Sequence, residues 1–212
     1  MALVTIGTQT WDDQNLDVDA FGDGASIVEV SASDQWKRCA DAGTPAWCYY
    51  DFDTANSNLY GRLYNWYVVS ASITAHPIVE NPQWKIPSRA DYNTLATYLG
   101  GRNLAGYPLK NSENWLTNLR RPGNGSNASG WKGNPGGFSK VDGAFFDLGW
   151  SGNWWTQTTA SAVNSYVNKL YYADTSIREL TPPNGMGFSI RLILSGSWTG
   201  SNGFRPSENW YG

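Results

Sequence analysis

Pairs of carboxylates that stand close together in this sequence could support hydrolytic chemistry. Asp51 with Asp53, and Asp174 with Glu179, are pairs of the residue type that glycoside hydrolases use as general acid and as nucleophile or base. Spacing in sequence is a weak signal for that chemistry, because a reaction depends on the geometry of a site. We therefore predict a protein that is not an enzyme, and we assign no catalytic residue.

Three further aspartates, Asp17, Asp19 and Asp23, suggest a calcium-binding loop. The EF-hand pattern needs an acidic or amide ligand at the fifth position of such a loop, and Phe21 occupies that position. We interpret the segment from Asp17 to Gly24 as a turn rich in Asp and Gly. We predict neither a metal site nor a cofactor.

The remaining reactive side chains are two cysteines and one histidine. Cys39 and Cys48 are too far apart in sequence for a Cys-x-x-Cys redox or zinc motif. They could close a short disulfide-bonded loop in an oxidising environment, or they could remain two thiols. His76 is the only histidine and precedes Pro77, which favours a structural or solvent-facing role over a catalytic one.

Composition excludes some partners and favours others. A net charge of −3 and a pI near 5.1 argue against nucleic acid as a partner. The one basic cluster, Lys110 to Arg121, is interpreted as a solvated loop. The chain holds 12 Trp, 12 Tyr and 7 Phe, more Trp than one core readily buries, and exposed Trp and Tyr suit contact with protein or sugar.

The N-terminal segment and the hydropathy give no sign of membrane insertion. The chain starts with an alternating pattern at Leu3, without a basic segment followed by an apolar one, and it has no apolar run of membrane-spanning length. If the protein works outside a cell, we expect it to leave by lysis, by assembly into a particle, or with a leader that this sequence lacks.

The periodicity of the first half predicts two helices and two strands. Alternation predicts strands at residues 3–10 and 26–30. Helical spacing of apolar residues predicts one helix over residues 56–69, despite Gly61. The clearest helix follows Ser88, which can cap it together with Asp91, and it ends at Gly100 and Gly101.

The second half reads as loops followed by short antiparallel strands. Residues 101–143 are rich in Gly and Asn, and strands are expected near Trp154 and at residues 165–172, 177–180 and 187–194. Two helices, short antiparallel strands and a high loop content together predict the α+β class. No linker divides the chain, so we expect one large domain.

The segment from Phe145 to Arg191 combines a patterned frame with two unpatterned loops. Its apolar and aromatic residues are Trp150, Trp154, Trp155, Tyr166, Leu170, Tyr172 and Ile177. Residues 173–176 and 178–186 show neither helical nor strand periodicity. Loops on a rigid scaffold are where binding specificity is usually located. This segment therefore indicates a binding module.

Short aromatic and glycine-rich segments recur along the chain, and they are Val4–Trp11 with Asn15 and Leu16, Tyr60–Tyr67, Trp84–Ser88 with the helix around Leu95, Gly136–Phe138, Trp154–Trp155 and Gly187–Arg191. In this order and spacing they resemble the Fibrobacter succinogenes major paralogous domain family, over about residues 3–194. The resemblance implies a C-type-lectin-like fold, shared with formylglycine-generating enzyme, over residues 1–194, followed by an aromatic extension at residues 195–212. That extension could fold over the domain or form an oligomer contact.

The same resemblance implies a receptor-binding or adhesin domain. Members of this family are typically surface or phage proteins, and some are targets of diversity-generating retroelements that vary the C-terminal strands and loops. The expected location is a virion, at the tip of a phage tail fibre, or the extracellular surface of a bacterium. The expected ligand is a cell-surface protein or glycan, and the domain could form a homo-oligomer such as a trimer or dock onto a fibre protein.

The resemblance also divides the C-terminal residues into two sets. The fixed framework is Trp154, Trp155, Leu170, Ile177, Phe188 and Arg191. The ligand-binding positions are Asn153, Asn164, Asn168, Tyr171, Asp174, Thr175, Arg178, Leu180, Thr181 and Pro182. Tyr171, Arg178 and Leu180 are the expected anchors, because aromatic residues and Arg dominate binding hot spots.

Two alternatives remain open. The protein could be a structural subunit of a virion or surface fibre that packs through the same face, or a degenerate enzyme of the formylglycine-generating type. Those enzymes hold copper with two C-terminal cysteines, and the related sulfoxide synthases hold iron with three histidines. This chain has one histidine and no cysteine after Cys48, so those ligands do not form either site. It also has Leu192 where the family commonly carries a cysteine.

Overall fold

The computed structural model describes residues 3–117 and 123–196, so the aromatic extension expected at residues 195–212 lies almost wholly outside the described residues. Helices and strands are mixed along the chain, which confirms the predicted α+β class. The helices are α1 (Ser33–Ala42), α2 (Ser57–Tyr60), α3 (Trp66–Thr74), α4 (Arg89–Tyr98) and α5 (Gly106–Leu109). The strands are β1 (Leu3–Ile6), β2 (Gln9–Asp12), β3 (Val28–Glu29), β4 (Ala46–Cys48), β5 (Leu63–Tyr64), β6 (Trp84–Lys85), β7 (Gly136–Ser139), β8 (Phe145–Leu148), β9 (Ser151–Thr159), β10 (Ser165–Tyr171), β11 (Ile177–Leu180) and β12 (Ile193–Leu194).

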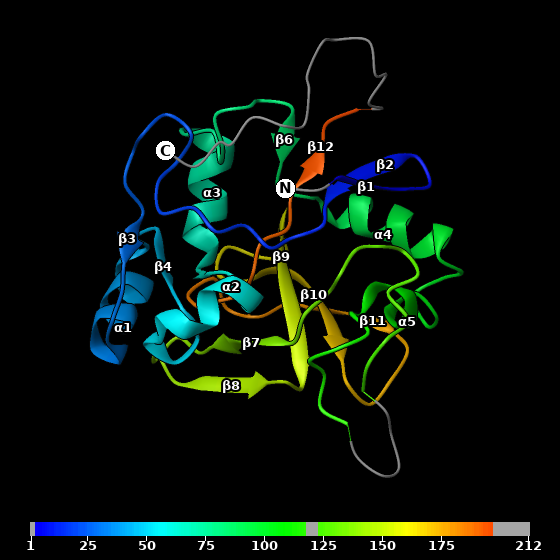
Figure 1. The fold of residues 1–212 in the computed structure, drawn as a ribbon. Helices are drawn as coiled ribbons and strands as arrows, with labels where there is room; N and C mark the ends of the chain where they lie inside the picture. Colours follow the sequence, from blue (N-terminus) through cyan, green and yellow to red (C-terminus); the bar gives the residue numbers. More distant parts are fainter. Residues whose placement is uncertain (1–2, 118–122, 197–212) are drawn as a thin grey trace.

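The strands form small sheets around one longer sheet. Their orders are β1-β2-β12-β6, β11-β10-β9, β3-β4-β5 and the hairpin β7-β8. In Figure 1, β9 runs through the middle of the molecule, with α1, α2 and α3 on its left and α4 and α5 on its right. The central sheet is antiparallel, as predicted for its strands.

The first predicted strand is a hairpin. Gly7 adopts a φ of 62°, a backbone conformation that glycine reaches without steric cost, and the chain reverses there so that β1 pairs with β2. The single strand expected at residues 3–10 is therefore two strands, and all four residues of the second are buried.

The single helix predicted over residues 56–69 is wrong. The chain forms α2, turns at Gly61 with φ 67° and ψ −162°, forms β5, and then begins α3 at Trp66. β5 pairs with β4, so a tertiary contact overrides the helical spacing of the apolar residues. A Cβ at Gly61 would approach the Leu16 carbonyl oxygen at 3.2 Å, which leaves little room for another residue.

The helix predicted after Ser88 is confirmed together with its cap. The Ser88 hydroxyl accepts a hydrogen bond from the Asp91 amide at 3.1 Å, and Asp91 Oδ2 accepts one from the Ser88 amide at 2.7 Å. This reciprocal arrangement is a capping box. The sequence reading missed α1, which buries Trp36 and Ala40 and ends at Gly43 with φ 67°.

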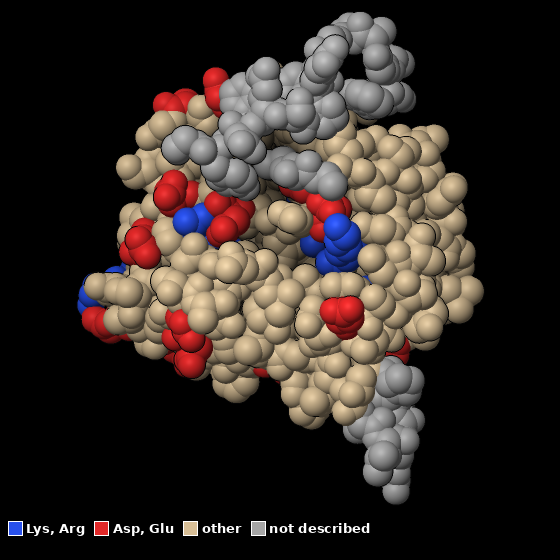
Figure 2. All heavy atoms as spheres, in the orientation of Figure 1, with Lys and Arg blue, Asp and Glu red and all other residues tan. Residues whose placement is uncertain are grey.

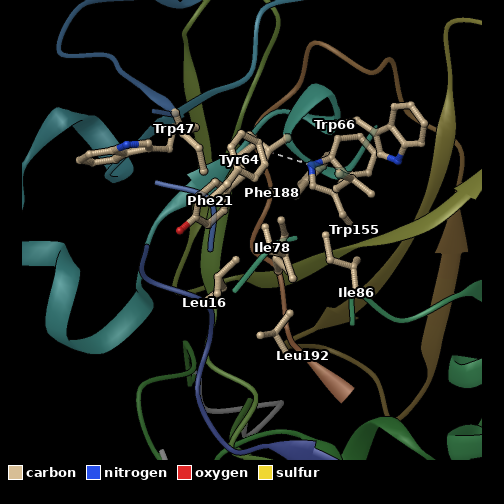
Figure 3. Packing of buried hydrophobic residues seen from close by; sticks show 14 of the residues in the cluster. Leu16, Phe21, Trp47, Tyr64, Trp66, Ile78, Ile86, Trp155, Phe188 and Leu192 are labelled. Carbon is tan, nitrogen blue, oxygen red and sulfur yellow. Dashed lines mark hydrogen bonds between the residues drawn. The ribbon is translucent and has the colours of Figure 1, made fainter. Parts of the chain in front are cut away.

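Two hydrophobic cores lie on either side of the central sheet. The Trp155 core contains Trp155 and Val167 of the sheet, packed with residues such as Tyr64, Phe188 and Leu192 (Figure 3). The Trp154 core contains Trp154, Leu170 and Ile177 of the sheet, packed with residues such as Trp11, Tyr92 and Trp131. Because both faces of the sheet are covered near its middle, its exposed residues are confined to its ends and its β11 edge.

The surface is sparsely charged on at least one side. In Figure 2 the charged side chains gather over the left half and near the centre, while the right-hand part is almost entirely uncharged. Within the described ranges, the helices are too short or too polar to traverse a lipid bilayer.

Candidate functional site

The candidate binding face belongs to the hairpin formed by β10 and β11. Residues directly opposite each other in a sheet lie on the same face. Lys169 is opposite Asn153 and Arg178, so these three share the face that covers the Trp155 core. Asn168 is opposite Trp154 and Glu179, so these three share the face that covers the Trp154 core.

The expected framework is buried, as a fixed scaffold requires. Trp154, Trp155 and Leu170 have no exposed surface, and Ile177, Phe188 and Arg191 are almost fully buried. Trp150 differs from the rest of the aromatic frame, because 42% of its surface is exposed. Trp150 therefore belongs to the surface and not to the interior.

Two of the predicted ligand-binding residues, Asn153 and Asn168, are not available to a macromolecule. Both are buried, because the sheet is covered on both faces at their positions. The Asn153 amide donates hydrogen bonds to the Gly137 carbonyl and the Ser151 hydroxyl. The Asn168 carbonyl oxygen accepts two from Arg102. Their predicted role as direct ligand contacts is corrected to a structural one.

Four other predicted residues meet at the turn between β10 and β11, and we call them the Tyr171 surface: Tyr171, Asp174, Thr175 and Arg178. The Arg178 guanidinium forms a short ion pair with the Asp174 carboxylate and lies 5.9 Å from the centre of the Tyr171 ring. Thr175 is exposed and donates its hydroxyl proton to the Asn103 carbonyl. The turn thus presents an aromatic ring, a cation and a carboxylate together.

The last four predicted residues lie at the other end of the hairpin, and we call them the Leu180 surface: Asn164, Leu180, Thr181 and Pro182. The Ser165 amide donates to the Pro182 carbonyl, and Asn164 pairs with Pro183. Leu180 is 42% exposed. A strand advances about 3.4 Å per residue, so the seven residues of β10 separate Ser165 from Tyr171 by roughly 20 Å, whereas Leu180 lies only about 7 Å along β11 from Arg178 of the Tyr171 surface.

Sequence reasoning missed three residues beside the Tyr171 surface: Lys169, Asp147 and Trp150. Lys169 Nζ donates to Asp147 Oδ2 at 2.9 Å and lies 5.3 Å from the Tyr171 ring centre. Trp150 packs edge-on against Tyr172, which in turn packs against Tyr171. Alternation along β10 places Lys169 and Tyr171 on one face, and that signal could have identified Lys169.

A buried ammonium group holds the Tyr171 surface from inside. Lys110 Nζ donates to the backbone carbonyls of Tyr171, Tyr172 and Asp174 at 3.3, 3.3 and 2.9 Å. Lys110 is only 2% exposed, and burial lowers the pKa of its ammonium while the Asp174 charge opposes that effect. The expectation that Lys110 belongs to a solvated loop is therefore wrong for this residue.

The same turn rests on a glycine of α5. The Gly106 amide donates to the Thr175 carbonyl at 2.8 Å, and a Cβ at Gly106 would lie 2.3 Å from the Ser176 carbonyl oxygen. No larger residue fits there without a shift of the turn. Lys110 and Gly106 together fix the backbone that carries the Tyr171 surface.

The carboxylates considered for hydrolysis are engaged in other interactions. Glu179 Oε2 accepts hydrogen bonds from Arg89 and Arg102. Burial raises the pKa of the Glu179 carboxyl, but these hydrogen bonds outweigh that effect and the pKa falls below its usual value. A general acid needs a raised pKa, so this environment suits a carboxylate that is ionised at neutral pH. Asp53 accepts the Ala55 amide and caps a short helical turn over residues 54–56.

The aspartates of the suspected calcium loop face basic side chains of the protein. Arg62 pairs with Asp17 at 2.9 Å and approaches Asp19 at 3.9 Å, and His76 Nδ1 lies 2.7 Å from Asp23 Oδ2. Within residues 3–117 and 123–196, no group of three or more metal-ligating side chains comes together. Cys39 and Cys48 are free thiols.

Comparison with protein families identifies the chain. The sequence model of the Fibrobacter succinogenes major domain matches residues 4–194. The chain belongs to this family. Neither a curated protein nor a solved structure gave a match.

Two of the segments that carry the resemblance to the Fibrobacter succinogenes major domain meet at one buried residue. Arg191, at the end of the Gly187–Arg191 segment, donates to the backbone carbonyls of Trp131 and Asp12 and to Asn15 Oδ1. Its guanidinium lies over the Trp131 ring at 4.3 Å, and burial lowers its pKa to about 10. In this member of the family, Arg191 ties the first and last segments of the domain together.

Proposed function

We propose that this domain binds a macromolecule on a cell surface through the Tyr171 and Leu180 surfaces. The observation that carries the proposal is the Tyr171 surface itself, where an aromatic ring and Arg178 lie at the exposed turn of a hairpin whose backbone Lys110 and Gly106 fix. Exposed aromatic and Arg side chains on a rigid support supply contact area at a low entropic cost.

The setting that fits this function is the tip of a phage tail fibre or the surface of a bacterium, and the fold that we assign is C-type-lectin-like. Both proposals rest on the order of aromatic motifs in the sequence and on membership of the family. We also propose that the domain acts without catalysis, since Glu179 is held ionised by two Arg side chains.

One observation favours a second function, that of a structural subunit of a virion or fibre. Trp150 and Leu180 are each 42% exposed, beside the Tyr171 surface and in the Leu180 surface respectively, and exposed apolar side chains also suit contact between subunits. In that case the same surfaces would pack on a neighbouring protein of the particle.

Replacing Tyr171 and Arg178 together by Ala tests the binding function. We expect the labelled variant to lose attachment to the bacterial cells that the wild-type domain coats, because it loses an aromatic ring and a cation from the same surface. The free energy of unfolding should change by no more than about 1 kcal/mol, because Arg178 is exposed and Tyr171 is only half-buried. A double Ala variant of Lys37 and Arg38, two exposed cations of α1, is the matched control.

Three outcomes decide between the functions. Loss of attachment in the Tyr171 and Arg178 variant, with the α1 variant unaffected, supports the binding function. A folded variant that attaches like the wild type contradicts it. A variant that attaches normally but fails to assemble into particles points to the subunit function.

A further inference from the structure

Two arginines meet at one carboxylate oxygen on the face of the sheet opposite Arg178. Arg89 is the first residue of α4, and Arg102 lies in the loop that follows that helix. Arg89 Nε and Arg102 Nη2 donate to Glu179 Oε2 at 2.8 and 3.1 Å. Within the described residues, Arg89 and Arg102 each form their ion pair with Glu179. Two cations therefore share one anion, and one positive charge is left unmatched.

Arg102 is held in place by a buried amide. Both of its terminal nitrogens donate to Asn168 Oδ1 at 3.0 Å, and Asn168 is fully buried in β10. The Nδ2 of the same amide is buried without a hydrogen-bond partner. The Asn168 carbonyl oxygen therefore fixes the orientation of the Arg102 guanidinium.

Arg89 keeps its binding edge free. Its guanidinium lies over the Tyr166 ring, 4.5 Å from the ring centre, and this cation–π contact favours one position of the side chain. Only its Nε is engaged by a side chain of the described residues, and the side chain is 46% exposed. The two terminal nitrogens can therefore donate a pair of parallel hydrogen bonds to a planar anion from solvent.

We propose that Arg89 and Arg102 form a binding site for the carboxylate group of an acidic polysaccharide. A carboxylate is planar, as the guanidinium fork requires, and its single charge matches the one unmatched positive charge. A sugar ligand is favoured by the Thr158 hydroxyl beside the site, which accepts the Arg89 amide and keeps its own proton for a sugar hydroxyl. This proposal rests on the proposed function and names the chemistry of its ligand.

Glu179 provides a test in which the loss of a charged residue should strengthen binding. Glu179 occupies Arg89 Nε and Arg102 Nη2, and its negative charge opposes the approach of a bound carboxylate to the free terminal nitrogens of Arg89. Replacing Glu179 by Gln should therefore strengthen binding of an acidic sugar, by about threefold if this repulsion has the strength of an exposed ion pair. A purely structural ion-pair network would give unchanged or weaker binding.

Calorimetric titration with short oligogalacturonate and oligomannuronate tests the site, with their methyl esters as uncharged controls and a glutamate oligomer as the acidic peptide. We expect at least one oligouronate to bind and its ester to bind at least about tenfold more weakly, because each ester lacks the charge that the fork recognises. Arg89→Gln should weaken binding by about fivefold or more, and Arg38→Gln, at an exposed ion pair of α1, should leave it unchanged.

The proposal is overturned if the acids and esters bind alike, if Arg89→Gln binds like Arg38→Gln, if no oligouronate binds, or if the glutamate oligomer binds better than the sugars. Arg89→Gln leaves the Tyr171 surface and the Arg102–Glu179 contact intact. The titration uses no cells, so its failure is distinguishable from a failure of the attachment experiment.

Discussion

Trp154 and Trp155 are neighbours in sequence, but their indole rings lie on opposite sides of β9. The Trp154 ring packs edge-on against Trp131 with 4.7 Å between centroids, and the Trp155 ring packs in the same manner against Phe188 at 4.8 Å. Each indole N–H donates inside the protein, from Trp154 to Asn15 Oδ1 and from Trp155 to the Tyr64 carbonyl. One strand therefore supplies a wall of both hydrophobic cores.

Truncating either indole should destabilise the whole domain. Replacing Trp155 by Ala is expected to lower the free energy of unfolding by about 3–5 kcal/mol, since a large buried ring is lost and a cavity remains. Both cores should still unfold in one transition in urea, because they share β9. Separate transitions, seen when fluorescence and circular dichroism are compared, would contradict this coupling.

Arg191 should be irreplaceable by another long side chain. Replacing Arg191 by Met removes its hydrogen bonds to the Trp131 and Asp12 carbonyls, while Asn15 Oδ1 keeps the Trp154 indole N–H, and each buried acceptor left unpaired costs about 1–3 kcal/mol. Arg191→Lys should recover only part of that loss, because an ammonium does not reproduce the planar fork. Chemical denaturation measures both values. The matched control is Arg38→Met, which should change stability by less than about 0.5 kcal/mol.

Lys110 should control the conformation of the Tyr171 surface more than the existence of the fold. Lys110→Met removes three hydrogen bonds to the carbonyls of Tyr171, Tyr172 and Asp174 while it keeps the apolar stem. We expect faster amide hydrogen exchange in residues 172–177, weaker attachment to cells and a cooperative unfolding transition. Lys37→Met, at an exposed position of α1, should change none of these. Unchanged exchange in the turn would show that Lys110 is not its anchor.

The Glu179 ion pairs should contribute stability at neutral pH and lose it in acid. The folded-state pKa of Glu179 lies below its unfolded value near 4.5, because the hydrogen bonds from Arg89 and Arg102 outweigh the opposing effect of burial. The contribution is therefore fully present above pH 4.5 and is lost as the pH falls through the folded-state pKa. The stability difference between the wild type and Glu179→Gln should shrink between pH 7 and pH 3. A constant difference across that range would contradict the shift.

Local signals in the sequence were reliable where nearby residues decide the structure. The helix after Ser88 is confirmed because its capping box involves residues three positions apart. The helix expected across Gly61 is wrong because β5 pairs with β4, a contact that no periodicity within residues 56–69 encodes. α1 was missed because it lacks a side-chain N-cap at Ala32 and has few apolar residues.

The candidate site was predictable only in part, for a related reason. The pattern of β10 and β11 separates buried from exposed positions only when one face of a sheet is open to solvent. Here both faces are covered near the middle, so Asn153 and Asn168 are buried although nothing adjacent in sequence indicates it. Lys110 lies more than sixty positions before the carbonyls that it holds, and such a pairing has no local signature.

Lys110 and Gly106 hold the turn after β10 through its main chain, and the Thr175 side chain adds one hydrogen bond to the Asn103 carbonyl. Lys110 and Gly106 bind carbonyl oxygens, which every amino acid carries, and they do so from positions outside the turn. The shape of the turn is therefore encoded elsewhere in the sequence, and its outward side chains are free to be exchanged. A library randomised at residues 171 and 178 should retain one backbone while it samples many chemistries, which makes this hairpin a natural starting point for selecting new binders.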